Sequence, residues 1–206
     1  MIHLPLASAS IAVTLVAAGA PAPATVATPS AAVEVVEFWR EAGPSLWFAK
    51  DPAFDEKFRN RFLALHERAA RGEFDGWAQT PDGALALLIL LDQFPRNAFR
   101  NTPRMYASDP HARAIARRVV SNGHDRMIEP ALRKFVYLPF AHSEDLADQE
   151  ESLRLCAQLG GIDYEHAKRH HGIIARFGRF PHRNPILGRV MRPEEQAYLD
   201  NGGFSG

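Results

Sequence analysis

The chain has 206 residues, enough for one domain of ordinary size with its own hydrophobic core. Its 24 basic and 24 acidic residues cancel, so no net charge draws the whole chain to nucleic acid or to an anionic membrane surface. The single cysteine, Cys156, excludes an intrachain disulfide and a multi-cysteine zinc site, and we expect it to be a small core residue.

The first 32 residues differ in composition from the rest, since they contain no Lys, Arg, Asp or Glu. The apolar run 11–20 and the small residues Ala22-Pro23-Ala24 fit a signal peptide, but the start lacks Lys and Arg. We therefore expect residues 1–32 to be a disordered leader or the product of an upstream start codon, with a cleaved signal peptide as the alternative. Gly19, Pro21 and Pro23 interrupt the run before it is long enough to span a membrane.

From residue 33 onward, a polar residue followed by proline repeatedly marks the start of a helix, and glycine marks its end. Asp51-Pro52 opens a segment that runs to Gly72, and Thr80-Pro81 opens the next one. Residues 84–91 are apolar on every side, which predicts a helix enclosed by others at the centre of the domain.

Four more helices are predicted further along the chain. The first starts at Asp109-Pro110 and stops near Gly123, and the second starts at Glu129-Pro130. The third has Ser143 as its N-cap and ends at Gly160-Gly161, and the fourth runs from about Asp163 to Phe177. Alternating apolar and polar runs bounded by turns are missing, so we predict a single all-α domain over residues 33–206.

A first group of polar residues follows the most apolar helix, at Asp92, Gln93, Arg96 and Asn97. Pro95 is expected to kink or end this helix and to leave carbonyl groups that the polar side chains can satisfy. A buried capping and ion-pair network is one interpretation. In the other, Asp92 is a candidate acid or base and the remaining three residues contact a ligand.

A second group lies at residues 142–149. The capping role of Ser143 and the helix dipole account for Glu144 and Asp145 in the first turn. They do not account for His142, just outside the helix, or for Gln149, which the helical spacing turns toward the core. We take His142 and Glu144 as candidate acids or bases and Gln149 as a candidate ligand contact.

Two histidines, His166 and His170, are four residues apart on one helix face and could share a metal ion. No HExxH pattern accompanies them, and a histidine on an apolar face is more often a hydrogen-bonded core residue. We therefore predict no metal and no cofactor, and keep His170 as a candidate acid or base.

The loop after this helix carries Arg179, His182, Arg183 and Asn184 among glycine and proline. Guanidinium groups bind carboxylate and phosphate oxygens in bidentate fashion, so this loop suits an anionic ligand. The alternative is that the loop ties itself to Asp92, Glu144 or Asp145 by salt bridges.

Four long motifs then stand out: LLDQFPRN at 90–97, YASDPHA at 106–112, HSEDLADQ at 142–149 and FGRFPHRNPILGR at 177–189. Together they resemble the bacterial domain of unknown function 924 family, over about residues 35–204. The resemblance implies a fold similar to tetratricopeptide-like α-α superhelices, no assigned activity, and a cytoplasmic protein. The matched positions are Asp92, Gln93, Arg96, Asn97, Asp109, His142, Ser143, Glu144, Asp145, Gln149, His170, Arg179, His182, Arg183 and Asn184.

These residues allow three functions. We favour a binding module that holds a small anionic molecule or an acidic peptide. The second is an enzyme whose acid and base come from Asp92, His142, Glu144 or His170. The third is a polar network that only fixes how the helices pack. Convergence of the groups on one open cavity favours the first two over the third.

Overall fold

A computed structural model describes residues 27–206. In this range the chain is all-helical and contains no strand, which confirms the predicted fold class. The predictions for the leader fall largely on residues 1–26 and lie outside the described residues. The first helix begins at Ser30, inside the segment that the composition assigned to the leader.

Nine α-helices follow one another within the described residues. They are α1 (Ser30–Trp47), α2 (Pro52–Ala70), α3 (Pro81–Leu88), α4 (Phe94–Ala98), α5 (Asp109–Ser121), α6 (Pro130–Ala141), α7 (Leu146–Cys156), α8 (Gly161–Phe177) and α9 (Pro193–Asp200). Short 3-10 turns are η1 (Asp75–Gln79), η3 (Pro103–Tyr106), η4 (His124–Met127) and η5 (Pro181–Arg183), and η2 (Ile89–Gln93) is a π-helical turn.

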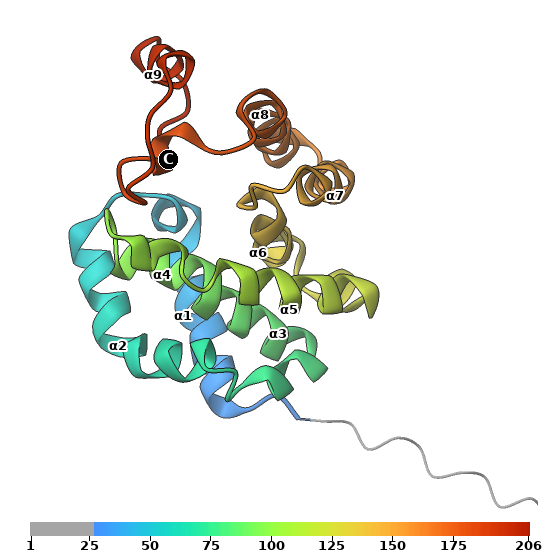
Figure 1. Ribbon diagram of the computed structural model, residues 1–206. Coiled ribbons are helices and arrows are strands. Elements are labelled where there is room, and N and C mark those ends of the chain that lie inside the picture. Colours follow the sequence, from blue (N-terminus) through green and yellow to red (C-terminus); the bar gives the residue numbers. More distant parts are fainter. Residues whose placement is uncertain (1–26) are drawn as a thin grey trace, which may run out of the picture.

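The main body is built around α3, which contacts α1, α5 and α6, while α2 packs against α4. From α5 to α8 each helix packs against the next. Figure 1 shows α8 and α9 on one side of the C-terminal end, with α2 and α4 on the other. The tetratricopeptide-like superhelix implied by the resemblance stays a prediction.

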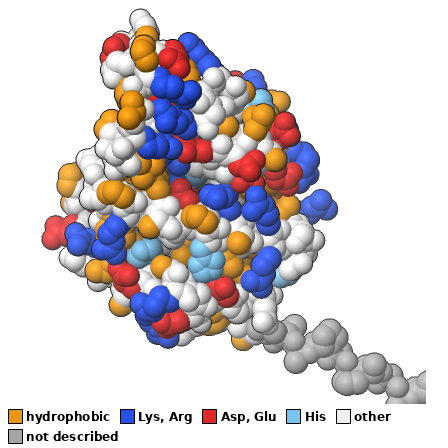
Figure 2. All heavy atoms as spheres, viewed as in Figure 1, with side chains coloured by type: hydrophobic (Ala, Val, Ile, Leu, Met, Phe, Trp, Pro, Cys, Tyr) orange, Lys and Arg blue, Asp and Glu red, His pale blue; other side chains and the backbone are white. Residues whose placement is uncertain are grey.

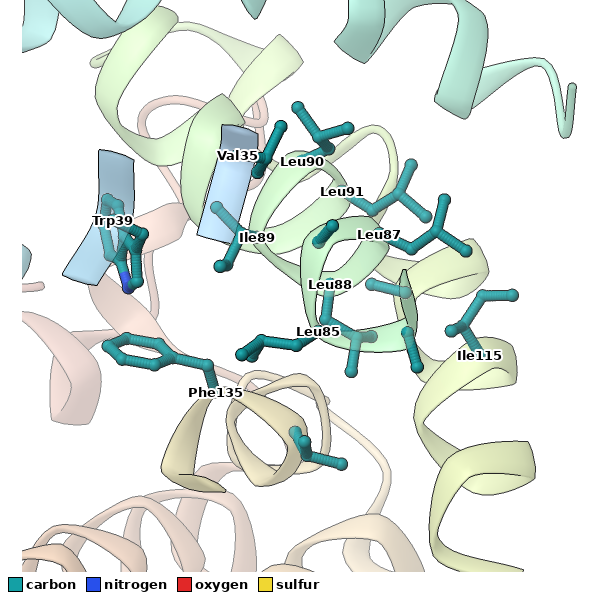
Figure 3. Close-up of a cluster of buried hydrophobic side chains, with 14 of the residues drawn as sticks. Val35, Trp39, Leu85, Leu87, Leu88, Ile89, Leu90, Leu91, Ile115 and Phe135 are labelled. Carbon is teal, nitrogen blue, oxygen red and sulfur yellow. The ribbon is translucent and has the colours of Figure 1, made fainter. Parts of the chain in front are cut away.

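The core is centred on the segment that the sequence predicted to be enclosed. Residues 84–91 are at most 1% exposed, and their side chains radiate from the helix toward α1, α5 and α6 (Figure 3). Trp39 of α1 and Phe135 of α6 meet edge to face, with ring centroids 5.3 Å apart. Burial of these apolar side chains is the main stabilising contribution to the fold.

A second, smaller apolar cluster belongs to the C-terminal part of the chain. Ile173, Ile174 and Phe177 of α8 pack with Phe180, and Tyr198 and Phe204 pack against them. Because this cluster is separate from the main core, the two parts meet across a boundary lined by other side chains.

Several predicted helix starts agree with the structure. Asp51 accepts a hydrogen bond from the backbone N–H of Phe54 at 2.9 Å, and Thr80 accepts one from Gly83 at 3.2 Å. The prediction that Ser143 caps the next-to-last predicted helix was wrong: Asp145 caps α7, because its carboxylate accepts from the N–H of Ala147.

Asp109 also differs from its expected capping position. The residue before α5 is Ser108, and Asp109 is the first residue of the helix. Its carboxylate is held by Arg96 instead, so the acid that the sequence placed at a helix end contributes to a long-range ion pair.

None of the helices in the described part of the chain is long and apolar enough to cross a membrane.

Candidate functional site

A cavity of about 320 Å³ lies between the main core and the C-terminal cluster. Much of its wall is apolar, with aromatic and aliphatic side chains that include Trp47, Phe48, Met105, Leu138, Phe180 and Phe204. Figure 2 shows basic and acidic side chains side by side in the band of surface between α9 and the main body. The cavity therefore combines an apolar interior with charged residues from several elements.

The π-helical turn η2 carries the first polar group into this region. Pro95 has no N–H and cannot bond to the carbonyl of Leu91 one turn earlier. That carbonyl accepts a hydrogen bond from the Ser108 hydroxyl at 2.6 Å, and the carbonyl of Leu90 contacts His66 Nδ1 at 2.9 Å. The free carbonyl groups of the widened turn are thus hydrogen-bonded by side chains from outside the helix, as expected for buried backbone groups.

Asp92, at the end of this turn, is wholly buried and anchors an ion-pair cluster. Arg96 lies 3.2 Å from its carboxylate and binds both oxygens of Asp109 at 2.9 and 3.0 Å. Burial alone would raise the pKa of Asp92, but Arg96 and His142 outweigh it and bring the pKa to about 2. Asp92 is therefore ionised at neutral pH.

His142 follows α6 directly and lines the cavity. Its Nδ1 lies 2.8 Å from an oxygen of Asp92, so Nδ1 carries the proton and donates to the carboxylate. Burial and the nearby Arg96 lower the pKa of His142, although Asp92 works in the opposite direction. At neutral pH the imidazole is neutral, with its lone pair on Nε2.

Arg183, in η5, is a buried cation with few hydrogen-bond partners among residues 27–206. Its side chain stacks between Tyr106 and Phe180, with Cζ 4.5 Å from each ring centroid, and its Nη2 donates to the carbonyl of His142 at 2.9 Å. Nη1 is 3.8 Å from Asp109, too far for a hydrogen bond. Nε is buried and has no hydrogen-bond partner among the described residues. The residue is only 7% exposed, so water compensates little.

Two further histidines, His170 of α8 and His182 of η5, line the cavity near Phe204. Their ring centroids lie 4.8 and 5.1 Å from that of Phe204. Burial lowers the pKa of His170 to about 4, and burial together with Arg183 lowers that of His182 to about 3. Both rings are neutral at physiological pH.

With the geometry established, the chain can be compared with known proteins. A family model described as bacterial protein of unknown function (DUF924) matches residues 35–203. The chain belongs to this family. This confirms the resemblance that the four motifs indicated.

A solved structure of the protein of unknown function ATU0120 from Agrobacterium tumefaciens is similar to this DUF924 protein. It is 51% identical in sequence, has a TM-score of 0.83, and the match covers 84% of the present chain and 98% of the other one. No curated protein matches the chain. The relatives therefore support the fold and leave the activity open.

In the DUF924 protein, most of the residues singled out in the sequence come together at the cavity. Asp92 lies behind the wall, buried beneath His142 and Arg96. Seven of the predicted residues line the cavity, and they come from five different parts of the chain. They are Gln93 of η2, Arg96 and Asn97 of α4, His142 after α6, His170 of α8, and His182 and Arg183 of η5.

The other candidates lie outside the cavity lining. Glu144 binds Arg189 at 2.7 and 3.0 Å and accepts from the N–H of Phe180, so its oxygens are occupied. Gln149 donates to the carbonyls of Ala141 and Ser143. These contacts hold the turn after α6 and the loop before η5 in place.

Arg179 and Asn184 also serve the loop. Both donate to Glu195, which is wholly buried, at 2.6–3.0 Å, and Arg192 binds the same carboxylate. The loop is therefore tied down by salt bridges, as in the alternative interpretation; Glu144 is one of the acids which that interpretation named, and Glu195 was not named. His182 and Arg183, between these ties, are held against the cavity.

Sequence reasoning did not select the aromatic part of the wall. Tyr106 and Phe180, which sandwich Arg183, belong to two of the four motifs quoted above, but the sequence alone marks them as ordinary apolar positions. Trp47 is both buried and in the cavity wall, so it fills the core and faces the site. The only signal for these residues was their closeness to the charged motifs.

Within residues 27–206 no group of three or more His, Cys, Asp or Glu residues is arranged to hold a metal ion. His166 and His170 both face the cavity, but Nδ1 of His170 is bonded to the carbonyl of His166 at 2.7 Å. Cys156 also lines the cavity, and burial raises the pKa of its thiol to about 11, which makes it a poor nucleophile.

Proposed function

We propose that this protein binds a small organic anion with an apolar body, and that Arg183 is the anchor for its oxyanion. The observation that carries the proposal is the unpaired Nε of Arg183, in a guanidinium that lines the cavity and is 7% exposed. A buried donor without a partner costs about 1–3 kcal/mol. A carboxylate or phosphate oxygen would remove this cost by accepting from Nε and Nη1.

The two carboxylates nearby do not fill this role. Asp92 and Asp109 formally balance Arg96 and Arg183, but Arg96 engages both of them at 2.9–3.2 Å. Arg183 keeps only one hydrogen bond, to a backbone carbonyl, within the described part of the chain. An anion entering the cavity would therefore displace no hydrogen-bonded carboxylate from Arg183, since Asp109 lies 3.8 Å away.

The rest of the wall supports a ligand with an apolar body. A volume of about 320 Å³ is at the lower end of the range for small-molecule pockets. Phe180 lies against the guanidinium, and Phe204 and Met105 add apolar surface to the same cavity. These properties favour a small organic acid over an acidic peptide, which would need a longer groove.

The test uses 3-phenylpropionate, a carboxylate with an aromatic body, as the probe in titration calorimetry. We expect the probe to bind the wild-type protein and to bind Arg183→Lys at least about tenfold more weakly. Lysine retains the positive charge but lacks the paired N–H donors with which a guanidinium binds a carboxylate in bidentate fashion. The matched control is Arg118→Gln, on the exposed face of α5 and outside the cavity lining, which should bind like the wild type.

A readout on the wild-type protein avoids dependence on the variant's folding. The NMR signal of the Arg183 Nε–H should move on addition of the probe, since that proton gains an acceptor. Saturable binding with no change at Arg183, or equal affinities for the wild type and a folded Arg183→Lys variant, would contradict the proposal.

A second candidate function, an acid–base enzyme, is favoured by the pairing of His142 with Asp92. The carboxylate fixes the imidazole with its Nε2 lone pair free, the arrangement of a general base. We expect the protein to hydrolyse mono-4-nitrophenyl glutarate, an activated ester with a free carboxylate, with His142 taking a proton from the attacking water. Equal rates for the wild type and His142→Phe would exclude this role.

A further inference from the structure

Two imidazoles beside the Arg183 anchor have their acceptor nitrogen fixed by the structure. His142 donates from Nδ1 to Asp92, and His170 donates from Nδ1 to the carbonyl of His166 at 2.7 Å. Neither a carboxylate nor a carbonyl can donate back, so in the neutral rings Nε2 must carry the lone pair. No other side chain or backbone group of residues 27–206 forms a hydrogen bond with either Nε2 atom.

The two rings are close enough to serve one ligand. Their centroids are 6.4 Å apart and meet edge to face, and both line the cavity. His142 is also joined to the anchor, because Arg183 donates to its carbonyl. Phe180 lies against both His170, at 5.5 Å between centroids, and the Arg183 guanidinium, at 4.5 Å. A ligand on Arg183 therefore meets two hydrogen-bond acceptors.

We propose that the cavity selects a hydroxy acid: its carboxylate binds Arg183, and a hydroxyl near the carboxylate donates to Nε2 of His142 or His170. This inference rests on the proposed function and adds the class of ligand. A simple acid would give neither of these acceptors, which line the cavity, a donor, whereas a hydroxyl group adds a hydrogen bond that favours binding.

The charges around the acceptors favour a neutral donor over an ammonium group. Arg96 and Arg183 both lie close to His142 and disfavour a positive charge there; Asp92 and Asp109 act in the opposite direction, but burial and Arg96 outweigh them and lower the pKa of His142. His170 is likewise next to Arg183 and to another histidine. An α-amino acid would bring its ammonium group to the same position and meet this repulsion, whereas a hydroxyl does not.

The experiment compares three probes that share a phenyl ring, a carboxylate and the same chain length. These are 3-phenylpropionate, each enantiomer of 3-phenyllactate, and phenylalanine, titrated into the full wild-type chain at pH 7.5. We expect one enantiomer of 3-phenyllactate to bind about tenfold more tightly than 3-phenylpropionate, and phenylalanine to bind more weakly than both.

The acceptor is assigned with two variants that keep an aromatic ring and lose the nitrogen, His170→Phe and His142→Phe. The preference for 3-phenyllactate, taken in each folded variant as the ratio of its affinity to that of 3-phenylpropionate, should fall to near onefold in at least one of them. His171→Phe, next along α8 and outside the cavity lining, is the control and should keep the preference. In wild-type protein labelled with ¹⁵N-histidine, an Nε2 signal should shift with 3-phenyllactate and not with 3-phenylpropionate.

The outcomes separate the two proposals. Binding of 3-phenylpropionate at Arg183 with no preference for either 3-phenyllactate enantiomer overturns the hydroxy-acid inference alone. Tightest binding of phenylalanine, or an unchanged preference in both folded histidine variants, does the same. Failure of all the probes to bind overturns the proposed function, and the inference with it.

Discussion

Asp92 is the residue on which the polar side of the cavity depends. It is wholly buried, and its charge is stabilised by Arg96 and by the Nδ1–H of His142. The same contacts set the tautomer of His142 and so the position of its lone pair. One carboxylate thus determines which nitrogen of His142 keeps its lone pair.

This role of Asp92 predicts a pH-dependent loss of stability for Asp92→Asn. The pKa is lowered from 3.8 to about 2, nearly two units at about 1.4 kcal/mol each, so the charge contributes on the order of 2 kcal/mol. Because the folded pKa is depressed, this contribution is present above pH 4 and is lost as the pH falls toward 2. Urea unfolding at pH 7 should show the variant less stable by about this amount, with a smaller difference at pH 3. An equal difference at both pH values would contradict this account of Asp92.

The spatial neighbours of Arg183 could not be predicted from the sequence. Its motif indicated an anion-binding loop, but its neighbours are 41 residues away at His142 and 74 residues away at Asp109. No local pattern gives such distances. The distribution of two acids between Arg96 and Arg183, on which the proposal depends, is visible only in the folded chain.

At the scale of elements, the π-helical turn η2 carries Asp92 and Gln93 to the site. It places Asp92 and Gln93 in the interior, at 0% and 4% exposure, where a regular helix end would be expected to turn polar residues outward. The sequence predicted a kink or end at Pro95, and the physical reason is the missing N–H. It did not predict Ser108, a residue 17 positions from Leu91, as the group that satisfies the freed carbonyl.

Ser108→Ala tests the support of this turn. Removing the hydroxyl leaves the buried carbonyl of Leu91 without its donor, and we expect the free energy of unfolding to fall by about 1–3 kcal/mol. Ser121→Ala is the matched control, because the Ser121 hydroxyl bonds to a carbonyl on an exposed helix end and should change stability by less than about 0.5 kcal/mol. Equal effects in thermal unfolding would show that the turn does not need Ser108.

The loop that follows α8 is fixed by Glu195, which binds Arg179, Asn184 and Arg192. Glu195→Gln should lower the free energy of unfolding by about 1–3 kcal/mol and weaken 3-phenylpropionate binding, since His182 and Arg183 lie within the tied segment. Glu194→Gln, which changes an exposed neighbour, should leave both unchanged. If Glu195→Gln binds the probe as the wild type does, the ties do not position the anchor.

Element prediction succeeded where a local signal marks a helix start. The pairs at Asp51-Pro52 and Thr80-Pro81 give capped helices, and the apolar run 84–91 is the buried centre. The helices α1 and α9 were not predicted, and neither Pro29 nor Arg192 before them offers a Ser, Thr, Asp or Asn side chain as a cap. Their positions depend on packing and on the Glu195 network.

At the scale of the whole molecule, the two apolar clusters are joined across a cavity that contains neutral histidines. The unfolded pKa of a histidine is about 6.5, while His170 and His182 have folded values of about 4 and about 3. Because the folded pKa values are depressed, the contribution of the two neutral histidines to the free energy of unfolding is complete above pH 6.5. It is lost as the pH falls toward 4 for His170 and toward 3 for His182.

The DUF924 protein should therefore lose stability between pH 7 and pH 4, by on the order of 2–3 kcal/mol for His170 alone. Urea unfolding across this range measures the slope, and His170→Gln should make it shallower. His124→Gln, outside the cavity, serves as the control. A slope that is the same in the wild type and His170→Gln would show that His170 is not neutral in the folded chain.

The most direct test of the central claim is a crystal structure of the wild-type protein soaked with 3-phenyllactate. The account predicts the carboxylate within hydrogen-bond distance of Arg183 Nε and Nη1, the phenyl ring against Phe180 and Phe204, and the hydroxyl at Nε2 of His142 or His170. A carboxylate bound elsewhere, such as at the exposed Lys50, with Arg183 Nε still unpaired, would contradict it.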